Sequence, residues 1–176
     1  MPYVQNVAGL TSVNYRAEPY KFREEQGCSL GKIFQPCAVD KPEDPVTPLI
    51  EAHAGDAVRI HVIGANSEQN GMFGVEGHEW PIEPYMPGAD MISVVEYAGS
   101  EVLDVFIRGG AGGPYRQVGD FVWSNARLPY TQSGQWGYLR VLPTGDSRIQ
   151  PLSASGSGAR QAEVQPGAQA IPTAMK

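Results

Sequence analysis

The sequence predicts an all-β protein, and three observations support this. The 176 residues include 21 glycines and 15 prolines, which are costly inside helices and typical of turns. Apolar and polar residues alternate over 57–63, as in a strand with one buried face. No long stretch has the 3.6-residue period of a helix, and short apolar runs separated by turn signals are typical of a sandwich or barrel.

The first part of the chain, residues 1–45, is expected to be an irregular N-terminal extension or linker. Within it, 18–26 predicts a short helix, because Pro19 is tolerated in a first helical turn and Gly27 ends the segment. The proline-containing segment 41–48 is interpreted as a linker into the folded domain.

Six strands are expected in the folded domain, which spans residues 46–143. Their ranges are 57–63, 72–80, 91–97, 101–107, 120–123 and 136–142. The three residues between the third and fourth strands fit a tight turn. The glycine-rich segment 107–120 lacks the lysine, hydroxyl and following helix of a phosphate loop, so we expect a long loop there.

The last part of the chain, residues 144–176, is rich in serine, glycine, alanine, glutamine and proline. Such a segment cannot bury enough apolar surface to offset its ordering entropy. We therefore expect a polar flexible tail that docks on a partner.

The acidic balance of the chain argues against several partner classes. The net charge is -6 and the pI is about 5.0, so nucleic acid and an anionic membrane face are not expected partners. No apolar run approaches the roughly 20 residues that span a bilayer. Residues 1–10 lack the pattern of a signal peptide, so we interpret the chain as cytosolic or as a mature or excised piece of a longer protein.

The two cysteines, Cys28 and Cys37, are close together in the sequence. A disulfide between them is expected if the protein is exported, and two free thiols are the alternative. The interpretation adopted here is an extracytoplasmic protein, periplasmic or secreted, although no signal peptide is visible in the chain.

Three motifs together carry a family resemblance. They are NYRAEP at 14–19, NGMFGVEGHEW at 70–80, and GDFVW at 119–123 followed by GQWGYLRV at 134–141. Over about residues 9–143 the chain resembles the last cupredoxin domain of multicopper oxidases, and looks most like the large bacterial type associated with manganese oxidation. The resemblance implies a cupredoxin-like Greek-key β-sandwich with an irregular N-terminal extension and an extended C-terminal tail.

The resemblance also implies where copper ligands would stand. In the family, histidines fill three places of the second motif, a His-Cys-His run follows the strand of the last motif, and a further histidine and an axial ligand come after it. This chain has other residues at those places: Gly71, Gly74, Glu76, Ser124, Asn125, Ala126, Tyr130 and Gln135. In the family, the first of these places binds the type 1 copper and the next two bind the trinuclear cluster.

The residues at these positions are poor copper donors. Blue copper needs a thiolate and imidazoles, whereas glycine and alanine offer no side-chain donor and neutral serine, asparagine and tyrosine are weak ligands. Glutamine is acceptable as an axial ligand only when the His₂Cys plane exists. We therefore expect no cofactor in this chain, and copper only in partner domains or chains.

The three histidines are expected to be structural or solvent-exposed. His53 and His61 are interpreted as ordinary exposed imidazoles, and His78 as a hydrogen-bonded structural histidine. A metal site that joins His78 and Glu76 is the weaker alternative, since imidazole and carboxylate can share zinc or manganese.

Two functions follow from the resemblance. The first is a copper-free cupredoxin-like subunit, or terminal domain, with a structural or interaction role in a multicopper-oxidase-type assembly. Its partners would be other cupredoxin domains, because in the family the trinuclear cluster lies between the first and last domains. The alternative is a part of an active oxidase of metal ions or phenol-type donors whose copper is held elsewhere.

Overall fold

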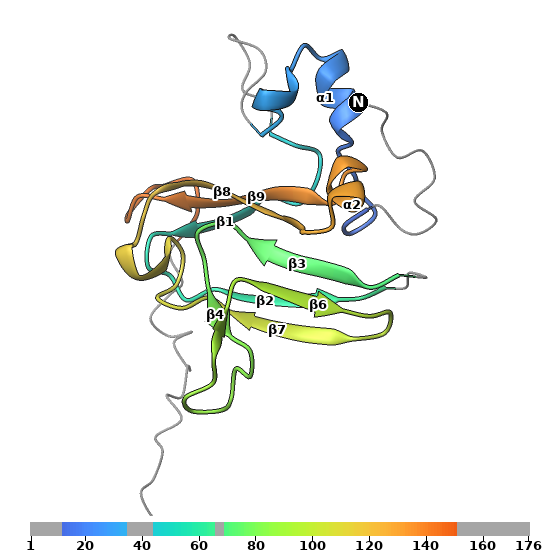
Figure 1. Cartoon of the computed structure of the whole chain (residues 1–176). Coiled ribbons are helices and arrows are strands. Elements are labelled where there is room, and N and C mark those ends of the chain that lie inside the picture. Colours follow the sequence, from blue (N-terminus) through green and yellow to red (C-terminus); the bar gives the residue numbers. More distant parts are fainter. Residues whose placement is uncertain (1–11, 35–43, 66–68, 151–176) are drawn as a thin grey trace, which may run out of the picture.

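The computed structural model describes residues 12–34, 44–65 and 69–150, and the all-β class predicted from the sequence is confirmed. Short helical segments accompany the strands (Figure 1): α1 (Tyr20–Glu25), η1 (Leu30–Lys32), η2 (Gly113–Tyr115) and α2 (Leu128–Gln132). The strands are β1 (Ile50–His53), β2 (Arg59–Ile63), β3 (Gly71–Val75), β4 (Trp80–Pro81), β5 (Met91–Ile92), β6 (Val94–Tyr97), β7 (Val102–Phe106), β8 (Gly119–Asn125) and β9 (Trp136–Leu142).

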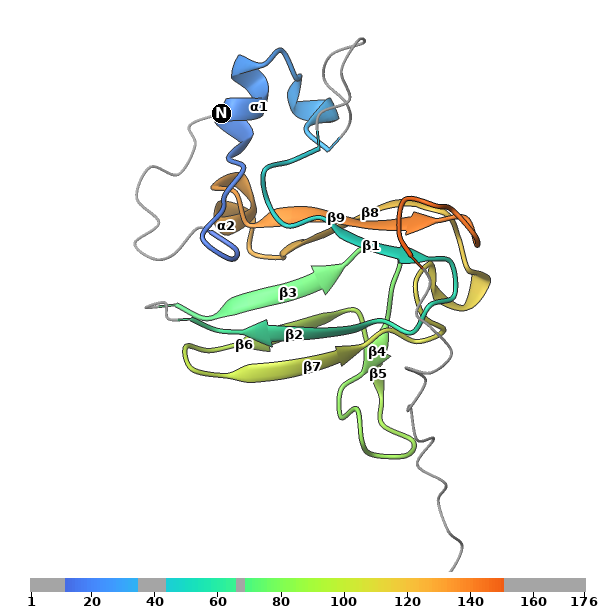
Figure 2. The ribbon, with the colours of Figure 1, turned by 180° about the vertical axis from the view of Figure 1, so that it is seen from behind.

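The strands form three sheets. The largest has the order β1-β9-β8-β3-β6, in which β1 and β9 are parallel and the other neighbours are antiparallel. Strands β2 and β7 form an antiparallel pair, and β4 and β5 form a short hairpin. Figures 1 and 2 both show β2 and β7 on one side of β8 and β9 and α1 on the other side.

The main core lies between the five-stranded sheet and the β2–β7 pair. Its buried members come from these two sheets, from β4 and from the loop after β7: Ala52, Val75, Trp80, Val105, Ile107, Ala111, Trp123, Leu139 and Val141. The alternation predicted for 57–63 is confirmed in β2, where Ile60 and Val62 pack against this core while Arg59, His61 and Ile63 are exposed. Burial of one face of each strand is what holds the two sheets together.

The N-terminal extension packs as a second core on the outer face of the five-stranded sheet. Tyr20, Cys28 and Ile33 are buried there against Val122, Trp136 and Tyr138. The indole Nε1 of Trp136 donates to the carbonyl of Glu18 at 2.7 Å, and the Tyr138 hydroxyl donates to the carbonyl of Phe34 at 2.7 Å. The extension is therefore part of the folded unit over its described residues.

Arg23 of α1 holds this extension to the sheet. The residue is 2% exposed, and its guanidinium donates from Nε and Nη2 to the carbonyl of Ile33 at 3.3 and 3.2 Å. The same group lies 5.5 Å from the centroid of the Trp136 ring, in cation–π geometry. One buried arginine thus joins α1, the segment after η1 and β9.

Several predicted boundaries are wrong. The expected strand 72–80 is interrupted because Gly77 adopts φ 67° and the His78 amide turns back to the carbonyl of Val75. The expected strand 91–97 is divided between β5 and β6, and β1 and α2 were not among the predicted elements. The predicted helix at 18–26 is confirmed as the shorter α1, and most of 107–120 is the expected loop, with η2 inside it.

Candidate functional site

The structure brings together four of the positions that the resemblance assigns to copper. Asn125 ends β8, and its backbone amide donates to the backbone carbonyl of Gln135 at 3.0 Å. The backbone amide of Gln135 in turn donates to the backbone carbonyl of Tyr130 at 3.0 Å. Gly71 begins β3, and Phe73 of the same strand lies directly opposite Asn125 of β8. Strand pairing and the α2 turn therefore place Gly71, Asn125, Tyr130 and Gln135 in one region.

Asn125 is the centre of a buried polar cluster. Its Nδ2 donates to Gln135 Oε1 at 2.7 Å, and its Oδ1 accepts from the backbone amides of Met72 and Arg127, both at 3.1 Å. Its backbone carbonyl accepts from the Thr131 hydroxyl. Asn125 is 4% exposed, so these bonds satisfy an amide that would be costly to bury alone.

The ring of Tyr97 occupies the space beside Gly71. A Cβ atom added to Gly71 would overlap with the ring carbons and hydroxyl of Tyr97, which lies directly opposite on β6. Burial raises the pKa of Tyr97, and the nearby Tyr130 adds to the shift. The Tyr97 ring therefore leaves no room for a larger side chain at position 71.

Three further positions lie on the outer face of the same sheet. Gly74 and Ser124 are directly opposite each other across β3 and β8, and Ser124 is also opposite Trp136 of β9. Burial raises the pKa of Tyr20 to about 12, with a further contribution from the negative charge of Glu76. Val75 points into the main core, so the next residue, Glu76, points to the outer face of the sheet. Ala126 follows β8 and contributes its backbone amide to the carbonyl of Met72.

His78 is buried and both of its ring nitrogens are engaged. The backbone amide of Gly112 donates to Nε2 at 3.1 Å, so Nδ1 carries the proton and donates to the carbonyl of Glu76 at 2.7 Å. The imidazole ring contacts the Phe121 ring edge-on, with 4.6 Å between the two ring centroids. Phe121 packs against the main core, so His78 lies on the inner side of the sheet, opposite to the Glu76 side chain. Within residues 12–34, 44–65 and 69–150, no group of three His, Cys, Asp or Glu residues is placed to hold a metal.

The prediction that His53 is exposed is wrong. His53 is 6% exposed, because the turn around Asp146 lies over it and the Asp146 carbonyl accepts from Nε2 at 2.8 Å. The Oδ2 atom of Asp56 lies 3.5 Å from Nδ1 of His53. The start of the expected tail, at Asp146, is thus bonded to the end of β1.

His61 is exposed as predicted, and it belongs to a surface cluster that the sequence analysis missed. Its Nδ1 lies 2.6 Å from Asp104 Oδ1 across the β2–β7 pair. Arg59 Nη2 donates to Asp104 Oδ2 at 2.7 Å and to the Tyr85 hydroxyl at 3.1 Å. Arg59 holds the pKa of Asp104 below its usual range, with a smaller contribution from Tyr85. The alternation of apolar and polar residues in β2 and β7 was a signal that these polar side chains share the exposed face. The register that pairs His61 with Asp104, however, comes only from the structure.

Cys28 is buried and disulfide-bonded. Cys37, its predicted partner, lies outside the described residues, as do 151–176 of the predicted tail. The pairing and the tail stay predictions.

The side chains at the copper positions do not fit a copper centre. The two buried amides, of Asn125 and Gln135, bind each other, and the Tyr97 ring lies where a ligand at position 71 would extend. Neither a thiolate nor a free imidazole is present among these residues. The cluster is a hydrogen-bonded core feature, and no electron-transfer step can be derived through it.

Comparisons with known proteins bear on the fold alone. No family model and no curated protein matches the chain. Similar solved structures include a multicopper oxidase (13% identity, 53% of this chain and 32% of that one, TM-score 0.44) and a blue copper oxidase from Nitrosomonas europaea (18%, 55% and 31%, 0.46). A third is the multicopper oxidase mgLAC (16%, 62% and 36%, 0.45). The matched region spans about a third of the length of these solved oxidases.

Proposed function

We propose that this chain is a copper-free cupredoxin-like module with a structural or interaction role in a multicopper-oxidase-type assembly. The observation that carries the proposal is the pairing of Asn125 with Gln135 inside the cluster that stands at positions which the resemblance assigns to copper. A pair of satisfied neutral amides stabilises a core and offers copper no soft donor. The manganese-oxidase-like type of the assembly belongs to this proposal.

The partners in this proposal are other cupredoxin-like domains or subunits, and any copper in the assembly is held by them. An extracytoplasmic location suits the disulfide at Cys28, because disulfides persist in oxidising compartments. Over the described residues no helix has both the length and the apolar character needed to cross a membrane.

Metal analysis of the purified chain tests the proposal. We expect no stoichiometric copper after incubation with Cu(I) or Cu(II), no blue absorption band, and no oxidation of a generic phenol donor. Stoichiometric copper with a blue colour in the unaltered chain would overturn it.

A restored variant tests the assignment of the positions. Gly71→His, Asn125→Cys, Tyr130→His and Gln135→Met would supply a complete ligand set, and Tyr97→Ala would clear the space beside position 71. We expect this variant, once folded, to turn blue with Cu(II). The matched control keeps Asn125 and should stay colourless, because it lacks the thiolate. A folded restored variant without colour would contradict the assignment.

A further inference from the structure

Strand β7 has an open edge. It pairs with β2 alone among the described strands. The bonds from Ile107 N to Val58 O and from Gly64 N to Glu101 O bracket that ladder. Hydrogen-bonded pairs alternate in an antiparallel ladder, so the backbone groups of Val102, Asp104 and Phe106 point away from β2. They are the groups to which a further strand would bond.

The chain begins to cover this edge and then leaves it. The amide of Arg108 donates to the carbonyl of Glu79 at 2.9 Å, which starts a second ladder beside β7. The ladder cannot continue, because Pro81 has no amide hydrogen. Residues 82–90 instead form an arm between β4 and β5, which projects from the sandwich in both ribbon views (Figures 1 and 2).

A groove of about 250 Å³ lies between the arm and β7. Trp80 and Val95 line it from the core side, and Ile82 and Tyr85 line it from the arm. Pro84 of the arm and residues 102–105 of β7 complete the lining. The groove therefore combines an open strand edge with apolar walls.

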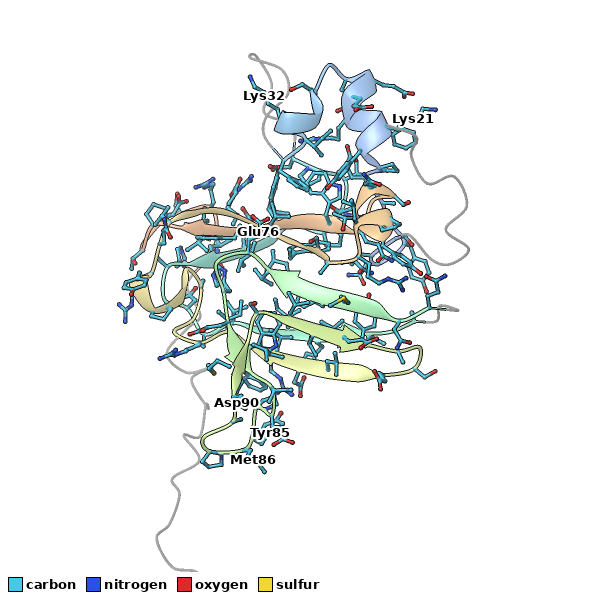
Figure 3. The ribbon with its side chains drawn as sticks, in the orientation of Figure 1. Lys21, Lys32, Glu76, Tyr85, Met86 and Asp90 are labelled. Atoms are coloured by element: carbon cyan, nitrogen blue, oxygen red, sulfur yellow. The ribbon has the colours of Figure 1, made fainter. Side chains whose placement is uncertain are left out.

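Large apolar side chains are exposed around this groove. Ile82, Tyr85, Met86 and Val102 are 56%, 73%, 58% and 62% exposed. Figure 3 shows Tyr85 and Met86 on the projecting arm, far from Lys21 and Lys32 on the N-terminal extension. The outer face of the five-stranded sheet is covered by that extension over the described residues, whereas the apolar walls of the groove are open to a partner.

The charge around the groove is negative. Asp104 forms an ion pair with Arg59 and lies 2.6 Å from His61, the two basic residues of this surface cluster. The carboxylates of Glu83 and Asp90, on the arm, make no ion pair within the described ranges, and the whole chain carries -6. A partner segment with lysine or arginine at its ends complements this rim.

We propose that this groove binds an extended segment of a partner protein, which adds to β7 as a strand. The segment places alternate apolar side chains in the groove and basic residues beside Glu83 and Asp90. Residues 102–105 of β7, which line the groove, offer about 13 Å of edge for such pairing. The inference rests on the proposed function, because it supplies the contact that an interaction module needs.

A synthetic peptide, Lys-Thr-Val-Thr-Val-Thr-Lys, is the probe for this site, and the same peptide with glutamate at both ends is its control. We expect the lysine peptide to bind the full chain at least tenfold more tightly by fluorescence anisotropy. We also expect slower hydrogen exchange at the amide of Asp104. Equal affinities, no binding at millimolar peptide, or protection only at the edges of β1 or β6 would overturn the proposal.

Matched variants assign the binding to the groove. Val102→Lys should weaken lysine-peptide binding at least tenfold, whereas Val118→Lys, at an exposed position outside the groove lining, should leave it unchanged. Glu83→Lys combined with Asp90→Lys should reverse the preference between the two peptides. Unchanged preference in that double variant contradicts the proposal even where Val102→Lys fails to fold. Copper analysis of the unaltered chain is a separate readout, so failure here and failure of the proposed function are distinguishable.

Discussion

The side chains of Asn125 and Gln135 are hydrogen-bonded to each other at 2.7 Å, and Asn125 also accepts from two backbone amides. Removing the Asn125 side chain therefore takes one hydrogen bond from the Gln135 side chain and one each from the backbone amides of Met72 and Arg127.

Asn125→Ala should lower the free energy of unfolding by about 2–4 kcal/mol, because each unsatisfied buried group costs about 1–3 kcal/mol. Urea denaturation followed by tryptophan fluorescence measures the change. Asn70→Ala, at an exposed asparagine, is the control and should change stability by less than about 0.5 kcal/mol. Equal effects of the two substitutions would show that the amide cluster is not stabilising.

Gly71→Ala should destabilise the protein through overlap with Tyr97. The expected loss is about 1–3 kcal/mol, as in other overpacked cores. Combining it with Tyr97→Ala should cost less than the sum of the two single changes, because the second removes the obstacle. Gly31→Ala is the control, since a Cβ at Gly31 meets nothing within 4 Å. Additive effects of the two changes would rule out the contact.

Tyr20 should make stability depend on alkaline pH. Burial, and then Glu76, raise its pKa from 10.0 to about 12. The folded state therefore holds this proton more tightly than the unfolded state. Its contribution to stability is complete below about pH 10 and is lost as the pH rises toward 12.

Glu76→Gln should lower the pKa of Tyr20, because it removes the negative charge, and NMR of the Tyr20 ring measures the titration. Glu24→Gln, at another residue of α1, is the control and should leave it unchanged. If the pKa of Tyr20 is the same in Glu76→Gln as in the unaltered chain, the Glu76 carboxylate is not near Tyr20. The alternative in which Glu76 shares a metal site with His78 would then have to be considered again.

Arg23→Lys should destabilise the N-terminal extension by about 2–4 kcal/mol, because lysine cannot make the same forked contact with the Ile33 carbonyl. Faster proteolysis within 12–34 and a red shift of Trp136 fluorescence would report the loosening. Lys21→Ala removes only an exposed pair with Glu25 and should have little effect. Loss of stability in both variants alike would contradict a special role of Arg23.

The motifs identified the residues of the polar cluster but not what holds them. Asn125 and Gln135 could be placed from the closing motif alone. Tyr97 could not, because its contact with Gly71 depends on the register of β3 and β6, which no local pattern specifies. The same limit hid the approach of His61 to Asp104.

Local signals explain which elements were found. Proline and glycine marked the limits of α1, but nothing local showed that its buried arginine would reach Trp136. Strand β1 was missed because Ala52 and His53 are adjacent and both buried, which breaks the alternation. Pro129 in the first turn of α2 was an available signal for that helix.

The parallel pairing of β1 with β9 joins the first and the last of the described strands. During synthesis, the residues of β1 leave the ribosome long before their partner exists, and the indole of Trp136 bonds a residue made 118 positions earlier. Strand β1 must therefore wait unpaired until β9 has been made, which slows folding and favours assistance by chaperones. A nascent chain that stops short of 136 lacks β9 altogether, so neither of its two cores can close.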